Sequence, residues 1–462
     1  MKILGKSLST LINLVKTKQI SAHEISEYFI KRVKRHNKEL NVFVTEPERH
    51  EKKQEGLLEG LPIPFKDNFC TKDIRTTAAS QVLDNFIPPY DATVVKKIKD
   101  AGGVVFGKTN MDAWAHGSST ETSDYGPTKN PHDHSRVAGG SSGGSAAVVA
   151  SYLAPAAIGS ETAGSIRQPA AWCGVVGLKP TYGRVSRYGV IAMGSSFDCP
   201  GPLTSTVEDA ALLLNIIAGN DPYDATTSSQ EPVDFRQELE KKKKFKIGIS
   251  EDYMELADPD TKSRLTQCIN TLSQMGHEIK TVKLIDPKYS ISVYTILQRA
   301  EVSSNLGRYD GIRYGNDRSK FGEEAKRRVM LGSYVLSHGY YDAYYKKAQK
   351  IRRLIIEDFK KTFNDVDLIL SPTTPSTALK LGDFEKYPFF GEAMDVLNEP
   401  AAVAGIPAIN LPVGLDSKGL PIGMQIMGNY FKEDEILNLG YQFEKETDFF
   451  GMRQKLYDMY PD

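Results

Sequence analysis

The 462-residue sequence has no excess of either charge, because 58 lysine and arginine residues are matched by 58 aspartate and glutamate residues. A protein that binds nucleic acid or an anionic membrane over its whole surface normally carries a clear positive net charge. The zero balance therefore argues against such a protein, while a local basic patch remains compatible with it.

Cysteine is scarce, and its positions show no CxxC spacing. The four residues are Cys70, Cys173, Cys199 and Cys268. This pattern argues against a zinc site or a disulfide framework and is typical of reduced thiols in a cytosolic protein.

Long hydrophobic runs are also missing. No apolar stretch approaches the roughly 18 residues that a membrane-spanning helix needs, and the N-terminus lacks the apolar core of a signal peptide. Instead, the first residues have the spacing of a short amphipathic helix, with Leu8, Leu11, Ile12 and Val15 on one face. We therefore expect a cytoplasmic protein with no membrane association.

The sequence does contain a regular alternation of helix and strand patterns. Ser21 opens a capping box before the second helix, and apolar strand patterns end at residues 65 and 106 and recur up to PIGMQIMG at 421–428. This alternation predicts an α/β fold, with a central mixed and mainly parallel β-sheet covered by helices on both faces. We expect a single domain over residues 1–462, in which the polar segment 220–245 is either a surface excursion or a seam.

The most informative segment runs from Arg136 to Tyr188 and is dense in glycine and small hydroxyl residues. Glycine inside a helix or strand costs about 0.5–1 kcal/mol, so this composition indicates close backbone approach or free N–H groups. A flexible linker would not contain the apolar runs AAVVA and CGVVGL. Two serines stand out, Ser141 in GGSSGG and Ser165 at the start of SIRQPAAW.

Residues 102–109, GGVVFGKT, match the phosphate-loop pattern GxxxxGK[ST]. A phosphate loop follows a strand and leaves its interior N–H groups free. Here a helix pattern precedes the motif, and its interior VVF reads as a buried strand. We therefore expect no nucleotide binding, and we expect replacement of Lys108 to leave any ATP-dependent step unchanged.

A histidine-based serine hydrolase is not supported either, although Gly139, Ser141 and Gly143 match GxSxG. In α/β-hydrolases the serine follows a strand, and an acid and a histidine come later in the chain. The residues before Gly139 are polar and turn-like, and the later histidines, His277 and His338, lie at helix ends where structural roles dominate.

A serine nucleophile therefore needs another base, and Lys66 in PIPFKDNF is the candidate. Its pKa would have to fall from about 10.4 to about 7, which burial can achieve. Pairing of Lys66 with Asp67 or with a surface acid is an equally good interpretation. Ser165 follows a glycine-containing turn at a helix N-terminus, where N–H groups can stabilise an oxyanion, and Ser141 could relay a proton between Ser165 and Lys66.

Lys66, the GGSSGGSAA block and GSIRQPAA together resemble the amidase signature family. The spacings of 24 residues between the two serines and 75 between the lysine and the first serine agree with it. The resemblance implies the amidase signature fold, with Ser165 as nucleophile, Ser141 as the cis-serine relay and Lys66 as base. It also implies that the backbone amides of Thr162, Ala163 and Gly164 form the oxyanion hole.

Within this family the chain is most similar to the glutamine-hydrolysing branch that serves tRNA-dependent amidotransferases, which convert Glu-tRNA(Gln) to Gln-tRNA(Gln). The similarity includes KRRVMLGSYVLSHGYYDAYYKKAQKIR, which lies outside the shared amidase signature. It implies that Arg328 and Asp395 hold the α-carboxylate and α-ammonium of glutamine and that Tyr294 contacts the substrate.

The same resemblance implies a heterotrimer. The B subunit would use ATP and magnesium and contact the tRNA, the small C subunit would brace the pair, and this chain would need no metal or cofactor. Two other interpretations stay open, a free-standing amidase for another small amide and a non-catalytic scaffold.

The chain departs from the family pattern at four places. Glu161-Thr162-Ala163 stands where Asp-Thr-Gly is usual, and alanine, unlike glycine, disfavours a positive φ. Cys199-Pro200 follows Asp198 where Gln-Ile or Gln-Val is usual, His116 stands where methionine is common and could line the acyl pocket, and segment 315–321 is short. None of these departures removes a predicted catalytic residue.

Overall fold

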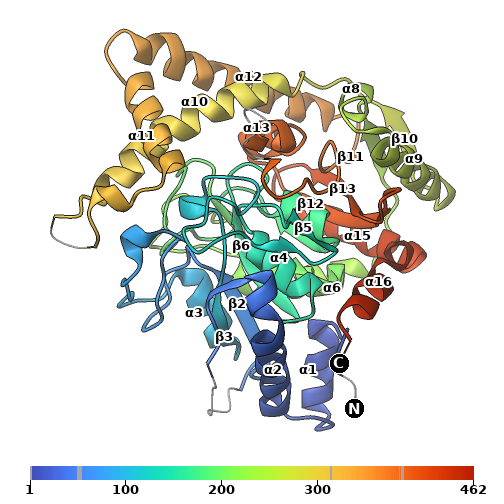
Figure 1. Cartoon of the computed structure of the whole chain (residues 1–462). Helices are drawn as coiled ribbons and strands as arrows, with labels where there is room; N and C mark the ends of the chain where they lie inside the picture. Colours follow the sequence, from blue (N-terminus) through green and yellow to red (C-terminus); the bar gives the residue numbers. More distant parts are fainter. Residues whose placement is uncertain (1–2, 49–54, 313–314, 384–385, 387–389, 462) are drawn as a thin grey trace.

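In the computed structural model, one 11-stranded sheet runs through the molecule (Figure 1). The structure describes residues 3–48, 55–312, 315–383, 386 and 390–461. The strand order is β1-β3-β2-β6-β8-β7-β12-β13-β11-β9-β10. The strands are β1 (Phe43–Thr45), β2 (Pro62–Lys66), β3 (Val104–Thr109), β6 (Ala156–Glu161), β7 (Val176–Lys179), β8 (Cys199–Thr204), β9 (Lys246–Ile249), β10 (Glu278–Thr281), β11 (Leu368–Pro372), β12 (Ala408–Leu415) and β13 (Pro421–Gly428).

The α/β class and the mixed sheet are confirmed. The parallel strand pairs form two separate groups within the sheet. Parallel pairing occurs in β3-β2-β6 and in β11-β9-β10, whereas the strands between these two groups pair antiparallel. Antiparallel pairing thus takes a larger share than the helix–strand alternation predicts. The physical reason is that β7–β8 and β12–β13 are joined without a crossover helix, and such neighbours must run antiparallel.

Helices cover both faces of the sheet. In β12, the side chain of Asn410 lies beside Gly423, on the face of the sheet that packs against Ala171 of α5. The next residue, Leu411, packs against Gly440 of α15. Because successive side chains of a strand point to opposite faces, α5 and α15 lie on opposite sides. Helix α4 packs beside α5, and α6 packs beside α15.

The helices of the described residues are α1 (Leu8–Lys16), α2 (Ala22–Leu40), α3 (Thr93–Asp100), α4 (Gly143–Ala150), α5 (Arg167–Cys173), α6 (Val207–Ile217), α7 (Phe235–Leu239), α8 (Glu251–Met254), α9 (Pro259–Gln274), α10 (Lys288–Asn305), α11 (Glu323–Val335), α12 (Lys347–Thr362), α13 (Phe390–Asp395), α14 (Glu399–Ala404), α15 (Glu433–Thr447) and α16 (Met452–Met459). Ser21 and Glu24 form the capping box predicted at the start of α2. None of the described helices is both long and apolar enough to cross a membrane.

Segment 220–245 packs against the rest of the chain through the short helix α7. Phe235 and Leu239 are buried in the main hydrophobic core, and α7 contacts α6 and α15. The expectation of one domain over residues 1–462 stays a prediction.

Helices α10, α11 and α12 pack together and rise from the top of the molecule in Figure 1. The parallel strands β2 and β6 lie side by side below them. Because parallel neighbours end at the same edge of a sheet, the residues that follow β2 and β6 meet there. Lys66, which ends β2, and the turn after β6 that leads to Ser165 lie at this edge.

Candidate active site

Lys66 is the last residue of β2 and is fully buried. Its Nζ donates hydrogen bonds to Ser141 Oγ at 2.7 Å and to the carbonyl oxygen of Ser160 at 3.0 Å. Burial lowers the pKa of the Lys66 amine to about 7, although three buried carboxylates oppose the decrease. The amine is therefore partly neutral near pH 7 and can accept a proton from a hydroxyl group.

The other interpretation of Lys66, pairing with Asp67, is not what the structure contains. The Asp67 carboxylate lies 3.8 Å from the Nζ of Lys108 instead. Successive strand residues point to opposite faces of the sheet, so Asp67 turns away from Lys66. Lys66 is left to face Ser141.

Ser141 is held where the backbone of its loop approaches other groups closely. The Gly140–Ser141 peptide bond is cis. A Cβ added at Gly140 would lie 2.0 Å from a carboxylate oxygen of Asp112, and one added at Gly143 would lie 2.0 Å from Thr120 Oγ1. Glycine is required at both positions because no side chain fits there, which explains the glycine-rich motif.

Ser165 lies next to this loop, because the N–H of Ser142 donates to the carbonyl oxygen of Ser165 at 3.1 Å. In the described part of the chain, the N–H groups of Ala163, Gly164 and Ser165 have no hydrogen-bond acceptor. These groups precede α5 and are available to an anion. Among the described residues with positive φ, Ala163 does not occur, so the backbone here does not demand glycine at this position.

Glu161, the residue that replaces the usual aspartate, organises the turn. Its carboxylate accepts the N–H groups of Ile166 and Arg167 at 3.1 and 3.2 Å, and it forms a buried ion pair with the Arg167 guanidinium. Arg167 also donates to the carbonyl oxygens of Ala163 and Asn398 at 2.8 and 2.9 Å. The turn is thus fixed from both ends by a charge-assisted network.

Asp198 holds the same turn from the other side. Its carboxylate accepts the Thr162 hydroxyl at 3.0 Å and the N–H of Met193 at 2.9 Å. Burial raises its pKa to about 6. Cys199, the next residue, begins β8 and is buried, so its replacement of a glutamine occurs inside the sheet.

A small cavity beside Ser165 contains all three residues predicted to bind substrate. Its volume is about 20 Å³, and its walls include Ala163, Ser165, Tyr294, Arg328 and Asp395. This is room for about one water molecule, so binding of a larger substrate requires side chains to move. Segments far apart in the chain therefore line one cavity beside Ser165.

The two charged residues predicted to bind substrate, Arg328 and Asp395, have different hydrogen-bond partners in this cavity. Arg328 Nε donates to Glu324 at 2.6 Å within α11. Asp395 accepts the Ser118 hydroxyl at 2.7 Å, and burial raises the pKa of its carboxyl to about 7. A Cβ on Gly164 would lie 2.0 Å from Asp395 Oδ1, so glycine at 164 is needed to bring this carboxylate to the turn. Burial also raises the pKa of the Tyr294 hydroxyl, which stays neutral.

Sequence reasoning missed several residues at this site. Ser118 and Glu399 line the cavity, and Arg167 braces the turn. Ser118 lies in HGSST and Arg167 in GSIRQPAA, both inside conspicuous motifs, but their partners come from residues 395 and 398. No spacing rule connects such distant positions.

His116 is buried beside this cavity, whose walls include its neighbours Ala115 and Gly117. Burial and the nearby Arg328 and Arg299 guanidinium groups lower the pKa of its imidazole far below the usual value. The ring is therefore neutral. In the described part of the chain neither ring nitrogen has a hydrogen-bond partner.

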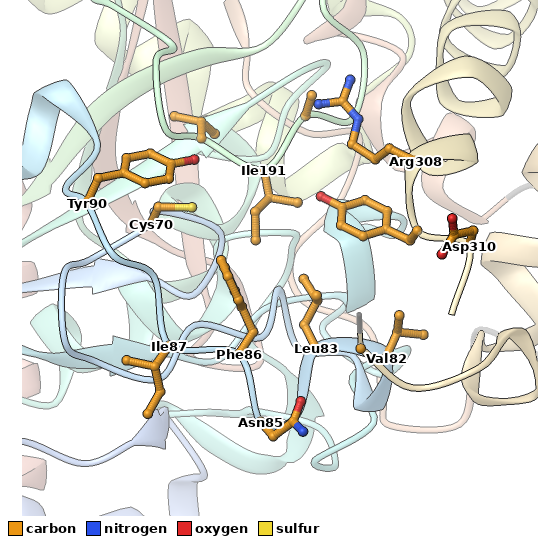
Figure 2. Close-up of a pocket in the computed structure, with 14 residues that line it drawn as sticks. Cys70, Val82, Leu83, Asn85, Phe86, Ile87, Tyr90, Ile191, Arg308 and Asp310 are labelled. Carbon is orange, nitrogen blue, oxygen red and sulfur yellow. The ribbon is translucent and has the colours of Figure 1, made fainter. Parts of the chain in front are cut away.

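A larger cavity of about 700 Å³ lies elsewhere and does not include the predicted catalytic residues (Figure 2). Its walls are mainly apolar and aromatic, with Phe86, Tyr90, Tyr309 and Ile191 among them. Among the described residues that line it there is no lysine or histidine that could serve as a base. The smaller cavity is therefore the better candidate for the active site, despite its size.

The GGVVFGKT motif is not a phosphate loop, because residues 104–109 are strand β3. Lys108 is fully buried and donates to the Phe69 carbonyl oxygen and to Thr76 Oγ1, at 2.5 and 2.7 Å. The strand predicted inside the motif is confirmed, and the expectation that replacing Lys108 leaves an ATP-dependent step unchanged stays a prediction. Lys108 braces the loop that follows Lys66, on the opposite face of the sheet.

The fold and this constellation define an enzyme of the amidase class. The Amidase family model matches residues 24–437, and the chain belongs to that family. It is 46% identical to the A subunit of glutamyl-tRNA(Gln) amidotransferase from Halothermothrix orenii, over 99% of this chain and 100% of the relative. It is also 46% identical to the protein of the same name from Nitrosococcus oceani, over 96% and 98% of the two chains.

Solved structures show the same relationship. The chain is similar to the crystal structure of the A subunit of glutamyl-tRNA(Gln) amidotransferase from Thermotoga maritima, with a TM-score of 0.85, 40% identity and coverage of 95% and 94%. It is also similar to 6-aminohexanoate cyclic dimer hydrolase, with a TM-score of 0.88, 25% identity and coverage of 96% and 98%. The chain is thus an enzyme of the amidase and amidotransferase type, on a scaffold that also serves other amides.

Proposed function

We propose that this chain is the glutaminase component of a tRNA-dependent amidotransferase that converts Glu-tRNA(Gln) to Gln-tRNA(Gln). The single observation that carries the catalytic part is the hydrogen bond from buried Lys66 to Ser141, beside the loop contact to Ser165. The relatives named as glutamyl-tRNA(Gln) amidotransferase components support the assignment to this complex.

In the proposed mechanism, Ser165 Oγ attacks the side-chain carbonyl of glutamine while its proton passes through Ser141 to Lys66. The N–H groups of the turn 162–165 stabilise the negative charge of the tetrahedral intermediate. Lys66 then returns a proton through Ser141 to the departing ammonia, which leaves a glutamyl ester on Ser165. Water hydrolyses the ester and releases glutamate.

Arg328 and Asp395 would select a free amino acid. The Arg328 guanidinium would bind the α-carboxylate of glutamine, and the Asp395 carboxylate would bind its α-ammonium group, both through charge-assisted hydrogen bonds. Their shared position in the cavity with Ser165 supports this role. Tyr294 would contact the substrate from the same wall.

The ammonia would pass to the B subunit, which uses ATP and magnesium and holds the tRNA, while the small C subunit braces the pair in the cytoplasm. Within the described residues there is no cluster of three or more His, Cys, Asp or Glu side chains placed to bind a metal. The neutral overall charge agrees with tRNA contact mainly through the partner.

The decisive experiment measures ammonia release from glutamine and from a panel of simple amides, with and without the B and C subunits. We expect a clear preference for glutamine. Arg328→Ala and Asp395→Ala should each lower kcat/KM for glutamine by roughly 10–150-fold, since each charge-assisted contact contributes about 1.5–3 kcal/mol, and should change propionamide hydrolysis far less.

A free-standing amidase is the second candidate, because the scaffold is shared with 6-aminohexanoate cyclic dimer hydrolase. It would hydrolyse another amide better than glutamine and would not bind the B subunit. Equal losses on glutamine and propionamide, together with a lower melting temperature, would assign Arg328 a structural role instead.

A further inference from the structure

The outer face of α11 and the turn that follows it carry a group of exposed apolar side chains. We name it the α11 surface; it comprises Met330, Leu331, Tyr334, Leu336, Tyr340 and Tyr344. Met330 is 69% exposed and Tyr334 48%. Soluble proteins rarely expose contiguous apolar groups of this kind unless another molecule covers them.

The three tyrosines of this surface lie against one another. The ring centroids of Tyr334 and Tyr340 are 4.2 Å apart, and those of Tyr340 and Tyr344 are 5.9 Å apart. Tyr341 to Lys346 form a π-helical turn that leads into α12. In Figure 1, α11 and α12 lie at the upper edge of the molecule, away from the sheet.

The chain's own packing does not cover this surface, because the opposite face of α11 is the one that is buried. Ala325, Arg328 and Gly332 point inward. A Cβ on Gly332 would lie 1.9 Å from the carbonyl oxygen of Arg299, so α11 is pressed onto α10. The outer face therefore stays open on the isolated chain.

The composition of the surface favours a protein over RNA as its occupant. RNA surfaces combine cations for phosphates with flat rings for bases. The tyrosine rings would suit bases as well, but Met330, Leu331 and Leu336 suit neither phosphates nor bases, whereas tyrosine and methionine are enriched at the centres of protein interfaces.

The charges around the surface indicate the character of the partner. The acids near it are already paired, for example Asp342 with Lys346. Lys347 and Lys350 are exposed, and neither forms an ion pair in the described part of the chain. An apolar patch with an acidic edge is complementary to this arrangement.

We propose that the α11 surface docks the ammonia-accepting B subunit. This inference rests on the proposed function. Arg328, on the inner face of the same helix, lines the cavity at Ser165. A partner bound to the outer face would lie one helix away from the point where ammonia forms, and would clamp the helix that holds the substrate carboxylate.

The first test places a photo-crosslinking benzoylphenylalanine at position 334 in the assembled complex with the B and C subunits and tRNA(Gln). We expect crosslinks to the B subunit. Crosslinks only to the C subunit or only to tRNA would overturn the proposal. The matched control replaces Tyr223, which is 72% exposed and lies outside α11, and should give no crosslink to the B subunit.

The second test measures affinity for the B and C subunits by sedimentation velocity. The double variant Tyr334→Ser and Tyr340→Ser should bind at least about 30-fold more weakly, as expected when a tyrosine cluster at an interface centre is truncated. Tyr223→Ser should bind within about twofold of the parent chain. Glutamine hydrolysis by the isolated double variant should be unchanged, which shows that the variant folds.

Unchanged affinity of the double variant would overturn the proposal that the α11 surface binds the B subunit and would leave the proposed function intact. A parent chain that hydrolyses glutamine but binds neither partner would overturn the amidotransferase assignment and the surface with it.

Discussion

At the scale of single residues, the contact between Lys66 and Ser141 governs the expected behaviour of the active site. Lys66→Ala and Ser141→Ala should each reduce glutamine hydrolysis near neutral pH about as much as Ser165→Ala, because Lys66 is the amine that contacts Ser141 beside the Ser165 loop. Groups that act as a unit show losses that do not add. The double variant Lys66→Ala and Ser141→Ala should therefore be little worse than either single variant, by steady-state kcat.

Additive losses would show that the two residues act independently and would exclude the relay. As controls, the melting temperatures of the variants are compared with that of the parent chain to check folding. Sedimentation with the B and C subunits checks partner binding.

The pH dependence of amide hydrolysis also depends on single residues. Burial gives Lys66 a pKa of about 7, so the reactive neutral amine is lost as the pH falls. Between about pH 8 and pH 6, kcat for propionamide should fall by about tenfold through this one group. Burial raises the pKa of Asp395 to about 7, so its attraction for an ammonium group is lost over the same range.

For glutamine, kcat/KM should therefore fall more steeply than for propionamide, since both groups titrate. The two profiles are measured side by side in buffers of constant ionic strength. Profiles of equal slope would show that Asp395 does not bind the substrate ammonium group.

At the scale of elements, the loop after β2 is held by the buried pair of Lys108 and Asp67. Burial lowers the pKa of Lys108 to about 8 and raises that of Asp67, so each charge depends on the other. Lys108→Met leaves the Asp67 carboxylate buried and unpaired, which should reduce the free energy of unfolding by about 3–5 kcal/mol. The measurement is urea-induced unfolding, and Lys108→Met with Asp67→Asn should recover part of the loss.

Lys96→Met is the matched control, because Lys96 forms an exposed pair with Asp100 one turn away in α3. Its unfolding midpoint should hardly change. A Lys108→Met variant as stable and active as the parent chain would show that the pair does not hold the loop.

At the scale of the whole molecule, the order of strands argues against two separable halves. Strand β7 pairs with β12, more than 200 residues later in the chain, and the main hydrophobic core contains both Leu8 and Tyr460. A fragment ending before the polar segment 220–245 would lose β12, one of the two strands that pair with β7. We therefore predict that residues 1–219 alone do not fold, as judged by circular dichroism and limited proteolysis.

A soluble fragment that resists protease would contradict this prediction and make segment 220–245 a domain seam. The intact chain, treated in parallel, is the control.

Much of this molecule could be predicted from the sequence, because helices, strands and turns depend on patterns within a few residues. The capping box at Ser21 is one case, and the strand inside GGVVFGKT is another. The serine motifs also stand out, since their glycines are needed where backbone approaches a neighbour, as at Gly140. The sequence by itself thus determined the α/β class, the family and the residue types of the candidate site.

Only the tertiary structure decided how these residues pair. Lys66 faces Ser141, 75 residues away, rather than its neighbour Asp67, because the alternation of β2 and its place beside β6 set the direction of each side chain. The pKa of Lys66 near 7 likewise depends on its burial by distant segments, which no local pattern encodes. The same packing buried Lys108 and left the outer face of α11 open, because contacts between segments far apart in the chain determine which surfaces are covered.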